Sequence, residues 1–137
     1  MQIYAHRGAN YRLPENTIEA FRQGLFDGAT ALEMDVWLTS DDVVVVFHDE
    51  NGWRTAGEDK VIFKTPWAIV KTWDLGKPYR VSTIVNHFLD RPFRVPTLKD
   101  VLEAFPSVFL NVDIKMHQTK AVRLVVDLIR QYKAASR

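Results

Sequence analysis

The stretch Ala31-Leu-Glu-Met-Asp-Val-Trp-Leu38 decides how the rest of the chain is interpreted. Side chains two residues apart on a strand share a face, so Glu33, Asp35 and Trp37 are predicted to point to one side. The residues between them are apolar and are predicted to face the core. The two carboxylates are then about 6–7 Å apart at their Cα atoms, close enough to converge on one hard cation. The alternative is a solvated strand face with two ordinary surface acids.

Composition limits the class of protein. The 137 residues fit one domain, 1–137, with a core of its own, and the net charge of +1 argues against a nucleic-acid-binding surface. The absence of cysteine excludes a disulfide scaffold and thiolate chemistry. The longest apolar run has five residues, and the first six lack the basic and apolar regions of a signal peptide. A soluble, cytoplasmic protein without a membrane span is expected.

The first part of the chain predicts a strand, a turn and a helix. A short apolar run ends at His6-Arg-Gly8, where glycine permits a sharp turn. Asn16 is predicted to cap the following helix, with Glu19 completing a capping box. Apolar residues at helical spacing follow, and Gly28 is placed to end the helix.

The centre of the chain combines a strand with an irregular segment. The run from Val43 to Phe47 is apolar enough to predict a strand buried on both faces, and it ends in His48-Asp49. Periodicity is lost over residues 50–95, which are rich in Gly, Pro and Trp and are predicted to form an inserted loop region. Its Trp residues are expected to pack under the loop, with a substrate pocket as the alternative.

The last part returns to regular patterns. Thr97 is predicted to cap a helix that Pro106 ends. A strand over residues 108–115 alternates apolar side chains with polar ones, placing Asp113 and Lys115 on one face, and a helix is predicted from Thr119.

Each of the four predicted strands delivers polar groups at its C-terminal end. Helices alternate with strands, which indicates parallel pairing, so these ends are expected to form one rim, where active sites of barrels and open sheets lie. Carboxylates suit Mg²⁺ or Ca²⁺, two histidines suit acid and base chemistry, and Arg7 and Lys115 suit a phosphate. Taken singly, each histidine is also explained as a structural residue, and Arg7 and Lys115 as surface charges.

The ordered set of motifs resembles the glycerophosphodiester phosphodiesterase family. The motifs are His6-Arg-Gly8, Pro14-Glu-Asn-Thr17, Glu33-x-Asp35, His48-Asp49, Pro96-Thr-Leu98 and Asp113-x-Lys115. The resemblance implies an α/β fold, the N-terminal half of a TIM (β/α)8 barrel with about four parallel strand–helix units. It also implies a metal-dependent phosphodiesterase that converts a small-molecule glycerophosphodiester into glycerol 3-phosphate and an alcohol, through a cyclic phosphate formed by the substrate's own glycerol hydroxyl.

The resemblance assigns roles to residues at the matching positions. His6 and His48 are the implied general acid and base. Mg²⁺ or Ca²⁺ is the implied cofactor, and three residue groups complete the site. These are Glu33, Asp35 and Asp113 as metal ligands, Arg7 and Lys115 on the phosphate, and Glu15 and Asn16 as supporting residues.

The chain departs from the family in three respects. The third carboxylate is Asp113, where the family usually has Glu, so the ligand is one methylene shorter. The turn Ser40-Asp-Asp42 lacks the glycine that tends to follow Asp in the family. The third departure is length: the chain has about four strand–helix units, whereas a closed barrel needs eight units and typically ~250 residues. Three explanations of the short chain stay open: a fragment of a longer gene product, a half-barrel that pairs as a homodimer, and a small open domain.

Two functional classes therefore remain. The first is the metal-dependent phosphodiesterase, because acid, base, ligand and phosphate-binding groups all occur within these units. The second is a non-catalytic relic or a module that binds a phosphate ligand without turnover.

Overall fold

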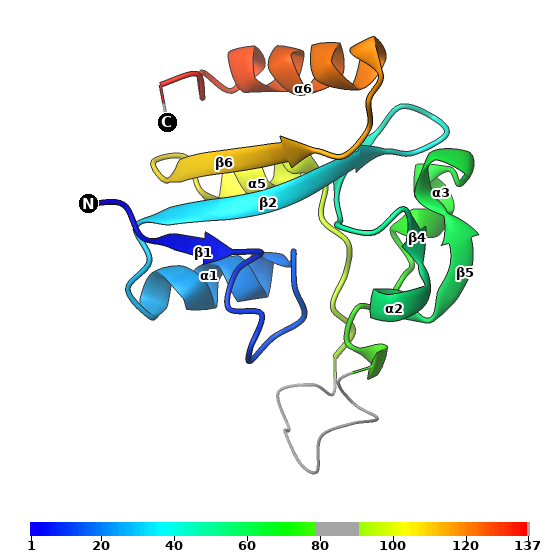
Figure 1. Ribbon diagram of the computed structural model, residues 1–137, viewed down its shortest axis with the longest axis horizontal. Coiled ribbons are helices and arrows are strands. Elements are labelled where there is room, and N and C mark those ends of the chain that lie inside the picture. The colour runs from blue at the N-terminus through cyan, green and yellow to red at the C-terminus, as the bar shows by residue number, and fades with distance from the viewer. Residues whose placement is uncertain (79–90, 137) are drawn as a thin grey trace.

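A computed structural model describes residues 1–78 and 91–136 and is built around one central strand (Figure 1). This strand is β2, Ala31–Leu38, which carries the two carboxylates. It pairs with β1 (Tyr4–His6), β3 (Val44–Val46) and β6 (Phe109–Ile114). The acidic stretch of the sequence therefore lies at the centre of the sheet.

Three strands of this sheet are parallel and one is not. β1 runs parallel to the start of β2, and β6 runs parallel to it from Ala31 to Val36. β3 is antiparallel to β2, with Val46 opposite Val36, so the predicted parallel direction of this strand is wrong. Residues 39–43 are the whole connection between β2 and β3. A parallel neighbour needs a crossover of a dozen or more residues, whereas so short a connection reverses the chain.

The first helix, α1 (Ile18–Phe26), begins one residue later than predicted. Its N-cap is Thr17, whose side chain accepts a hydrogen bond from the backbone N–H of Ala20. The prediction of Asn16 as the cap is therefore wrong, and Glu19 completes no capping box with it. Thr17 Oγ1 also donates to the carbonyl of Pro14, which links the cap to the turn that precedes the helix. The Asn16 side chain is left to face the sheet.

Two further helices cover the sheet as the sequence predicts. α5 (Leu98–Ala104) begins at a capping box in which Thr97 and Asp100 each bond the other's backbone N–H. α6 (Thr119–Gln131) follows β6 and lies above it in Figure 1, with the helix axis roughly along the line of the strand. The core joins apolar residues of β2 with those of α5 and α6: Leu32, Met34, Val36, Leu98, Val101, Leu102, Ala121 and Val125. The alternation in β2 therefore directs its apolar face into this core.

The segment after β3 forms several short elements rather than a plain loop. They are β4 (Asn51–Gly52), α2 (Trp53–Ala56), β5 (Glu58–Val61), a 3-10 turn η1 (Ile62–Lys64) and α3 (Trp67–Val70). Trp73 is buried in a second core here, edge-on to Phe47. The limits predicted for this insertion, residues 50–95, stay a prediction, and residues 79–90 within it lie outside the described part.

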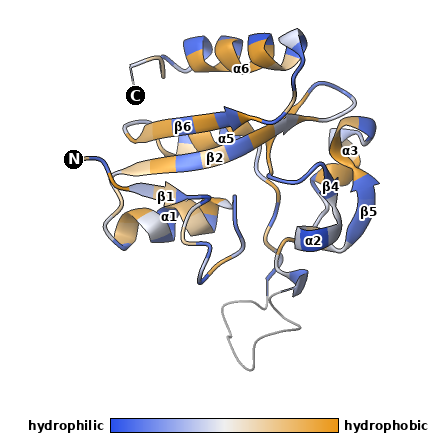
Figure 2. Cartoon of the chain, viewed as in Figure 1, coloured by the Kyte–Doolittle hydropathy of each residue, from blue (hydrophilic) through white to orange (hydrophobic). Residues whose placement is uncertain are grey.

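Hydropathy follows this division of the chain. Figure 2 shows hydrophobic residues gathered on β2, β6 and their neighbouring helices, and hydrophilic residues along α2 and β5. Among the described residues, no helix combines the length and apolar composition that crossing a membrane requires.

The tight packing of β1 against α1 generates a stability prediction. Gly8 has φ +81°, and a Cβ there would lie 2.6 Å from the carbonyl carbon of Ala20. Gly57 also has a positive φ, +68°, but a Cβ there would meet nothing within 4 Å. Gly57→Ala is expected to cost about 1–2 kcal/mol of unfolding free energy through backbone strain alone. Gly8→Ala is expected to cost about 1–3 kcal/mol more, because the backbone must shift. Urea unfolding of both variants measures the difference, and equal losses would contradict the close contact.

Candidate active site

The carboxylates of β2 lie in a row of polar side chains that crosses the sheet. Glu33 lies opposite His6 of β1, and Asp35 lies opposite Asp113 of β6. Parallel strands in this register bring all four residues to one region of the sheet. Candidate acid, base and ligand groups from sequence positions more than a hundred residues apart thus become neighbours.

Asp35 is the most buried member of the row. Asp35 is 1% exposed, and three cationic or amide groups surround its carboxylate. Lys115 Nζ lies 3.0 Å from Oδ1, and Asn16 Nδ2 donates to Oδ2 at 3.0 Å. Arg7 Nε lies 3.2 Å from the same Oδ2 as an ion pair, outside hydrogen-bond alignment. Burying an ionised carboxylate is costly unless it is paired and hydrogen-bonded, and these three groups meet that need.

The turn after β1 aims Arg7 at this carboxylate. Arg7 has φ 59° and Asn16 has φ 57°, both in the left-handed region that residues other than glycine rarely adopt. The Asn16 backbone N–H donates to the carbonyl of Arg7 at 2.9 Å, which ties the two together. The Arg7 N–H donates to Glu33 Oε2 at 3.1 Å. Such conformations cost of order 1–3 kcal/mol each and gather at functional sites.

Glu33 has a higher pKa than an ordinary surface acid. Partial burial, followed by the negative charge of Asp35, raises its pKa. The nearby His6, whose Nε2 lies 3.7 Å from Oε2, and the contacts with Arg7 offset this rise in the Glu33 pKa only in part. An additional positive charge beside Glu33 would therefore be favourable.

Asp113 and Lys115 lie at the β6 end of the row. Lys115 Nζ contacts Asp113 Oδ2 at 2.7 Å as well as Asp35. The hydrogen bond that Lys115 donates to Asp113 is the largest cause that raises the Lys115 pKa, and Asp35 adds to it. The Asp113 side chain is 53% exposed, so it lies at the edge of the site.

The predicted metal ligands are carboxylates, which a hard cation prefers, but their side chains are not arranged around one common position. Within residues 1–78 and 91–136, no three acidic or histidine side chains lie close enough together to hold a metal ion. The ligand set of Glu33, Asp35 and Asp113 therefore stays a prediction, with Lys115 between the last two. The buried Oδ1 of Asn16 has no hydrogen-bond partner in the described part of the chain, and it is an oxygen of the kind that Mg²⁺ and Ca²⁺ bind.

His48 approaches the row from the end of β3. The Phe47 N–H donates to the carbonyl of Asp35 at 2.9 Å, which holds this part of the chain against β2. The indole N–H of Trp37 donates to the His48 carbonyl at 2.9 Å. The His48 ring nitrogen Nδ1 lies 2.6 Å from Asp49 Oδ1. Both histidines predicted as acid and base are thus held against β2, His6 by strand pairing with Glu33 and His48 through its carbonyl.

Arg54 of α2 is a site residue that the sequence patterns did not predict. Its Nε donates to Asp49 Oδ2 at 2.6 Å, and its two terminal nitrogens donate to Glu15 at 2.9 and 2.7 Å. It lies in the segment 50–95, where periodicity is lost, and its partner Glu15 is 39 residues away. Only the folded chain brings the two acids to one guanidinium.

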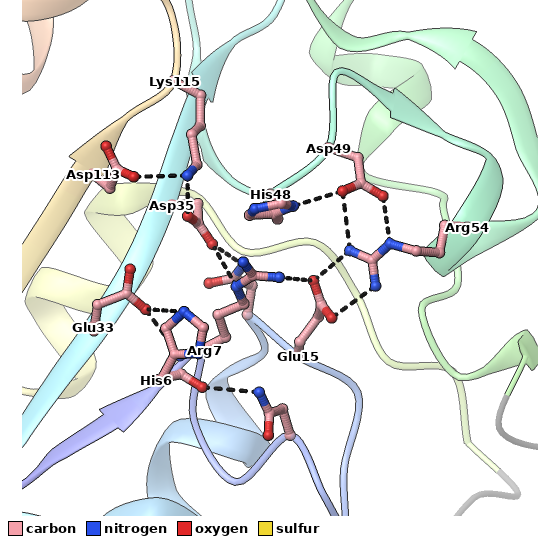
Figure 3. A network of polar contacts seen from close by, with 12 residues as sticks. His6, Arg7, Glu15, Glu33, Asp35, His48, Asp49, Arg54, Asp113 and Lys115 are labelled. Atoms are coloured by element: carbon pink, nitrogen blue, oxygen red, sulfur yellow. Dashed lines mark hydrogen bonds and ion pairs between the residues drawn. The ribbon is translucent and has the colours of Figure 1, made fainter.

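These contacts form one network of alternating charge (Figure 3). Glu15 contacts both Arg7, at 3.3 Å, and Arg54. Burial alone would raise the pKa values of Glu15 and Asp49, but the hydrogen bonds and charge of Arg54 outweigh burial and leave both below their ordinary values. The same two acids raise the pKa of Arg54. The network therefore extends from the carboxylate of Asp35 to the ring of His48.

The fold and the site together define an α/β domain with acids, histidines and cations gathered on one sheet. A sequence model of the Glycerophosphoryl diester phosphodiesterase family matches residues 6–136. The chain belongs to this family, as its motifs indicated.

Named relatives agree with this assignment. The chain is 34% identical over 128 residues to the human protein Lysophospholipase D GDPD1, covering 93% of this chain and 40% of that protein. It is 34% identical over 115 residues to the Glycerophosphodiester phosphodiesterase of Caldanaerobacter subterraneus, covering 82% of this chain and 44% of that protein. The chain thus spans less than half the length of these relatives.

Solved structures show the same relation. A glycerophosphodiester phosphodiesterase from Agrobacterium tumefaciens superposes with a TM-score of 0.84 at 28% identity, covering 97% of this chain and 54% of that one. An Oleispira antarctica phosphodiesterase in complex with the product sn-glycerol-3-phosphate gives 0.79 at 28% identity, covering 96% and 53%. The predicted fold class, about half of a TIM barrel, is confirmed, with the correction to the direction of β3 given above.

The charge network predicts a pH dependence of stability. Because the pKa of Glu15 is below its ordinary value of 4.5 in the folded chain, its stabilising effect is present above that pH and is lost as the pH falls through the folded value. Glu15→Gln is expected to lower the unfolding free energy by about 1–2 kcal/mol at pH 7.

Urea unfolding at pH 7 and pH 3 checks this dependence. The deficit of Glu15→Gln should shrink at pH 3. The control is Asp127→Asn, because Asp127 and its partner Arg130 are both about 70% exposed or more. A deficit that is equal at both pH values would contradict the role of the Glu15 charge.

Proposed function

We propose that this chain hydrolyses glycerophosphodiesters to glycerol 3-phosphate and an alcohol, with the help of a divalent cation. The observation that carries the proposal is the row across β2: His6 contacts Glu33, the buried Asp35 is flanked by Arg7 and Lys115, and His48 lies beside Asp35 in Figure 3. Family membership supports the reaction class, and a solved relative was captured with sn-glycerol-3-phosphate.

The proposed reaction divides the work between the two histidines. One removes the proton from the free glycerol hydroxyl, whose oxygen attacks phosphorus, while the other protonates the departing alcohol. Water then opens the cyclic phosphate by the same steps in reverse order. Arg7 and Lys115 supply positive charge for the phosphate oxygens.

The cation site is proposed on the acids of β2 and β6. Glu33, Asp35 and Asp113 would hold Mg²⁺ or Ca²⁺, which would stabilise the negative charge that builds up on the phosphate oxygens. The raised pKa of Glu33 supports this choice, because a nearby cation would offset its burial and the charge of Asp35.

A second function rests on a different observation. Asp113 is one methylene shorter than the usual family residue, is more than half exposed and pairs with Lys115. A site of this kind would bind a phosphate ligand through Arg7 and Lys115 without turning it over. This is the alternative of a non-catalytic binding module.

Hydrolysis of glycerophosphocholine distinguishes the two functions. We expect choline release by the 137-residue chain with Mg²⁺ or Ca²⁺, and loss of release when EDTA removes the cation. His48→Ala is expected to lower kcat by about 10²–10⁴-fold, because a general acid–base group contributes that much. Lys60→Met is the control, because Lys60 is on β5 and, within the described part of the chain, forms its ion pair with Glu58 alone.

Two outcomes would contradict the hydrolase. Wild-type rates in His48→Ala would remove His48 from the mechanism. Binding of glycerol 3-phosphate by calorimetry without turnover under any cation would establish the binding module instead.

A further inference from the structure

Arg54 donates two hydrogen bonds to Asp49, the acid next to His48. Its Nε lies 2.6 Å from Asp49 Oδ2 and its Nη2 lies 3.1 Å from Asp49 Oδ1. The other side of the guanidinium holds Glu15. A planar guanidinium fixes both distance and orientation of a carboxylate in this paired geometry, which a lysine ammonium cannot do.

The grip on Asp49 determines where the proton of His48 lies. The pKa of Asp49 is below its ordinary value, since the hydrogen bonds from Arg54 and His48 outweigh partial burial, so Asp49 is ionised at neutral pH. An ionised carboxylate only accepts hydrogen bonds. Nδ1 of His48, 2.6 Å away, must therefore carry a proton. In the neutral ring, Nε2 is then the atom with the free lone pair.

The backbone of His48 is fixed separately from its ring. Trp37 holds the carbonyl of His48, and Trp37 itself stacks on Phe63 with ring centroids 6.3 Å apart. Among the described residues, Asp49 is the hydrogen-bond partner of the His48 ring, accepting from Nδ1. Rotation and tautomer of the ring therefore depend on Asp49, and the orientation of Asp49 depends on Arg54.

We propose that Arg54 is a positioning residue for His48: by holding Asp49, it keeps the ring proton on Nδ1 and leaves Nε2 for proton transfer with the substrate. This inference rests on the proposed function for its effect on turnover. The competing explanation is that Arg54 only fastens α2 to the loop before α1 through Glu15. The tautomer of His48 separates the two, because fastening alone does not require a particular ring proton.

The experiment combines a spectroscopic readout with kinetics. Side-chain ¹⁵N shifts of neutral His48, assigned by comparison with His48→Gln, report which ring nitrogen carries the proton. The variants are Arg54→Met, Arg54→Lys and the control Lys60→Met. Arg54 and Lys60 side chains are 49% and 48% exposed, and both lie in the segment after β3. Glycerophosphocholine hydrolysis is measured on the same proteins.

The expected result has three parts. The wild type and Lys60→Met hold the proton on Nδ1, and Arg54→Met shifts it toward Nε2. kcat falls about 10–100-fold in Arg54→Met, the usual loss when a group that orients a functional histidine is removed, with KM changed less than about 3-fold. Arg54→Lys is expected to give a tautomer shift and a kcat between those of the wild type and Arg54→Met, because an ammonium cannot reproduce the paired contact.

Two results would overturn the proposal. They are an unchanged His48 tautomer in Arg54→Met, whether or not kcat falls, and a shifted tautomer with wild-type kcat. If Arg54→Met does not fold, an unchanged tautomer in Arg54→Lys overturns it. If the wild type shows no turnover, the proposed function fails separately, and the tautomer comparison alone decides whether Arg54 sets the ring proton.

Discussion

The buried carboxylate of Asp35 is the constraint on which the rest of the structure depends. At 1% exposure it needs compensating charge, and its partners come from three separate segments: Arg7 after β1, Asn16 before α1 and Lys115 after β6. Folding therefore brings these segments together, because removing an ion from water is costly unless partners replace the water. Two of these groups, Arg7 and Lys115, are also those proposed to bind phosphate, so stability and function share one network.

The local backbone is strained where it serves this network. Arg7 and Asn16 both have a positive φ, and neither is glycine. Each conformation turns a side chain toward Asp35, and glycine at either position would supply no side chain at all. The charge network continues from Arg7 through Glu15 and Arg54 to Asp49. A long-range chain of paired charges therefore joins the carboxylate face of β2 to His48.

Sequence reasoning succeeded where a repeating pattern carried the information. Alternation in β2 predicted both the face of Glu33 and Asp35 and the direction of the core, and Thr97 as the N-cap predicted the start of α5. It failed where tertiary contacts decide. The apolar run of β3 does not reveal whether the strand runs parallel or antiparallel to β2. Asn16 is a residue type that often caps helices, but its side chain donates to Asp35 instead. Arg54 lies in an aperiodic segment, so only the fold assigns its partners.

The measurement that tests this account most directly is the stability of Asp35→Asn, which keeps the shape of the side chain and removes its charge. The account predicts a loss of about 2–4 kcal/mol in urea unfolding, because Arg7 and Lys115 lose their shared buried partner. Asp113→Asn is the matched control, since Asp113 is 53% exposed and its pair with Lys115 is expected to contribute about 1 kcal/mol or less. Equal stability of Asp35→Asn and the wild type would contradict the central role of Asp35.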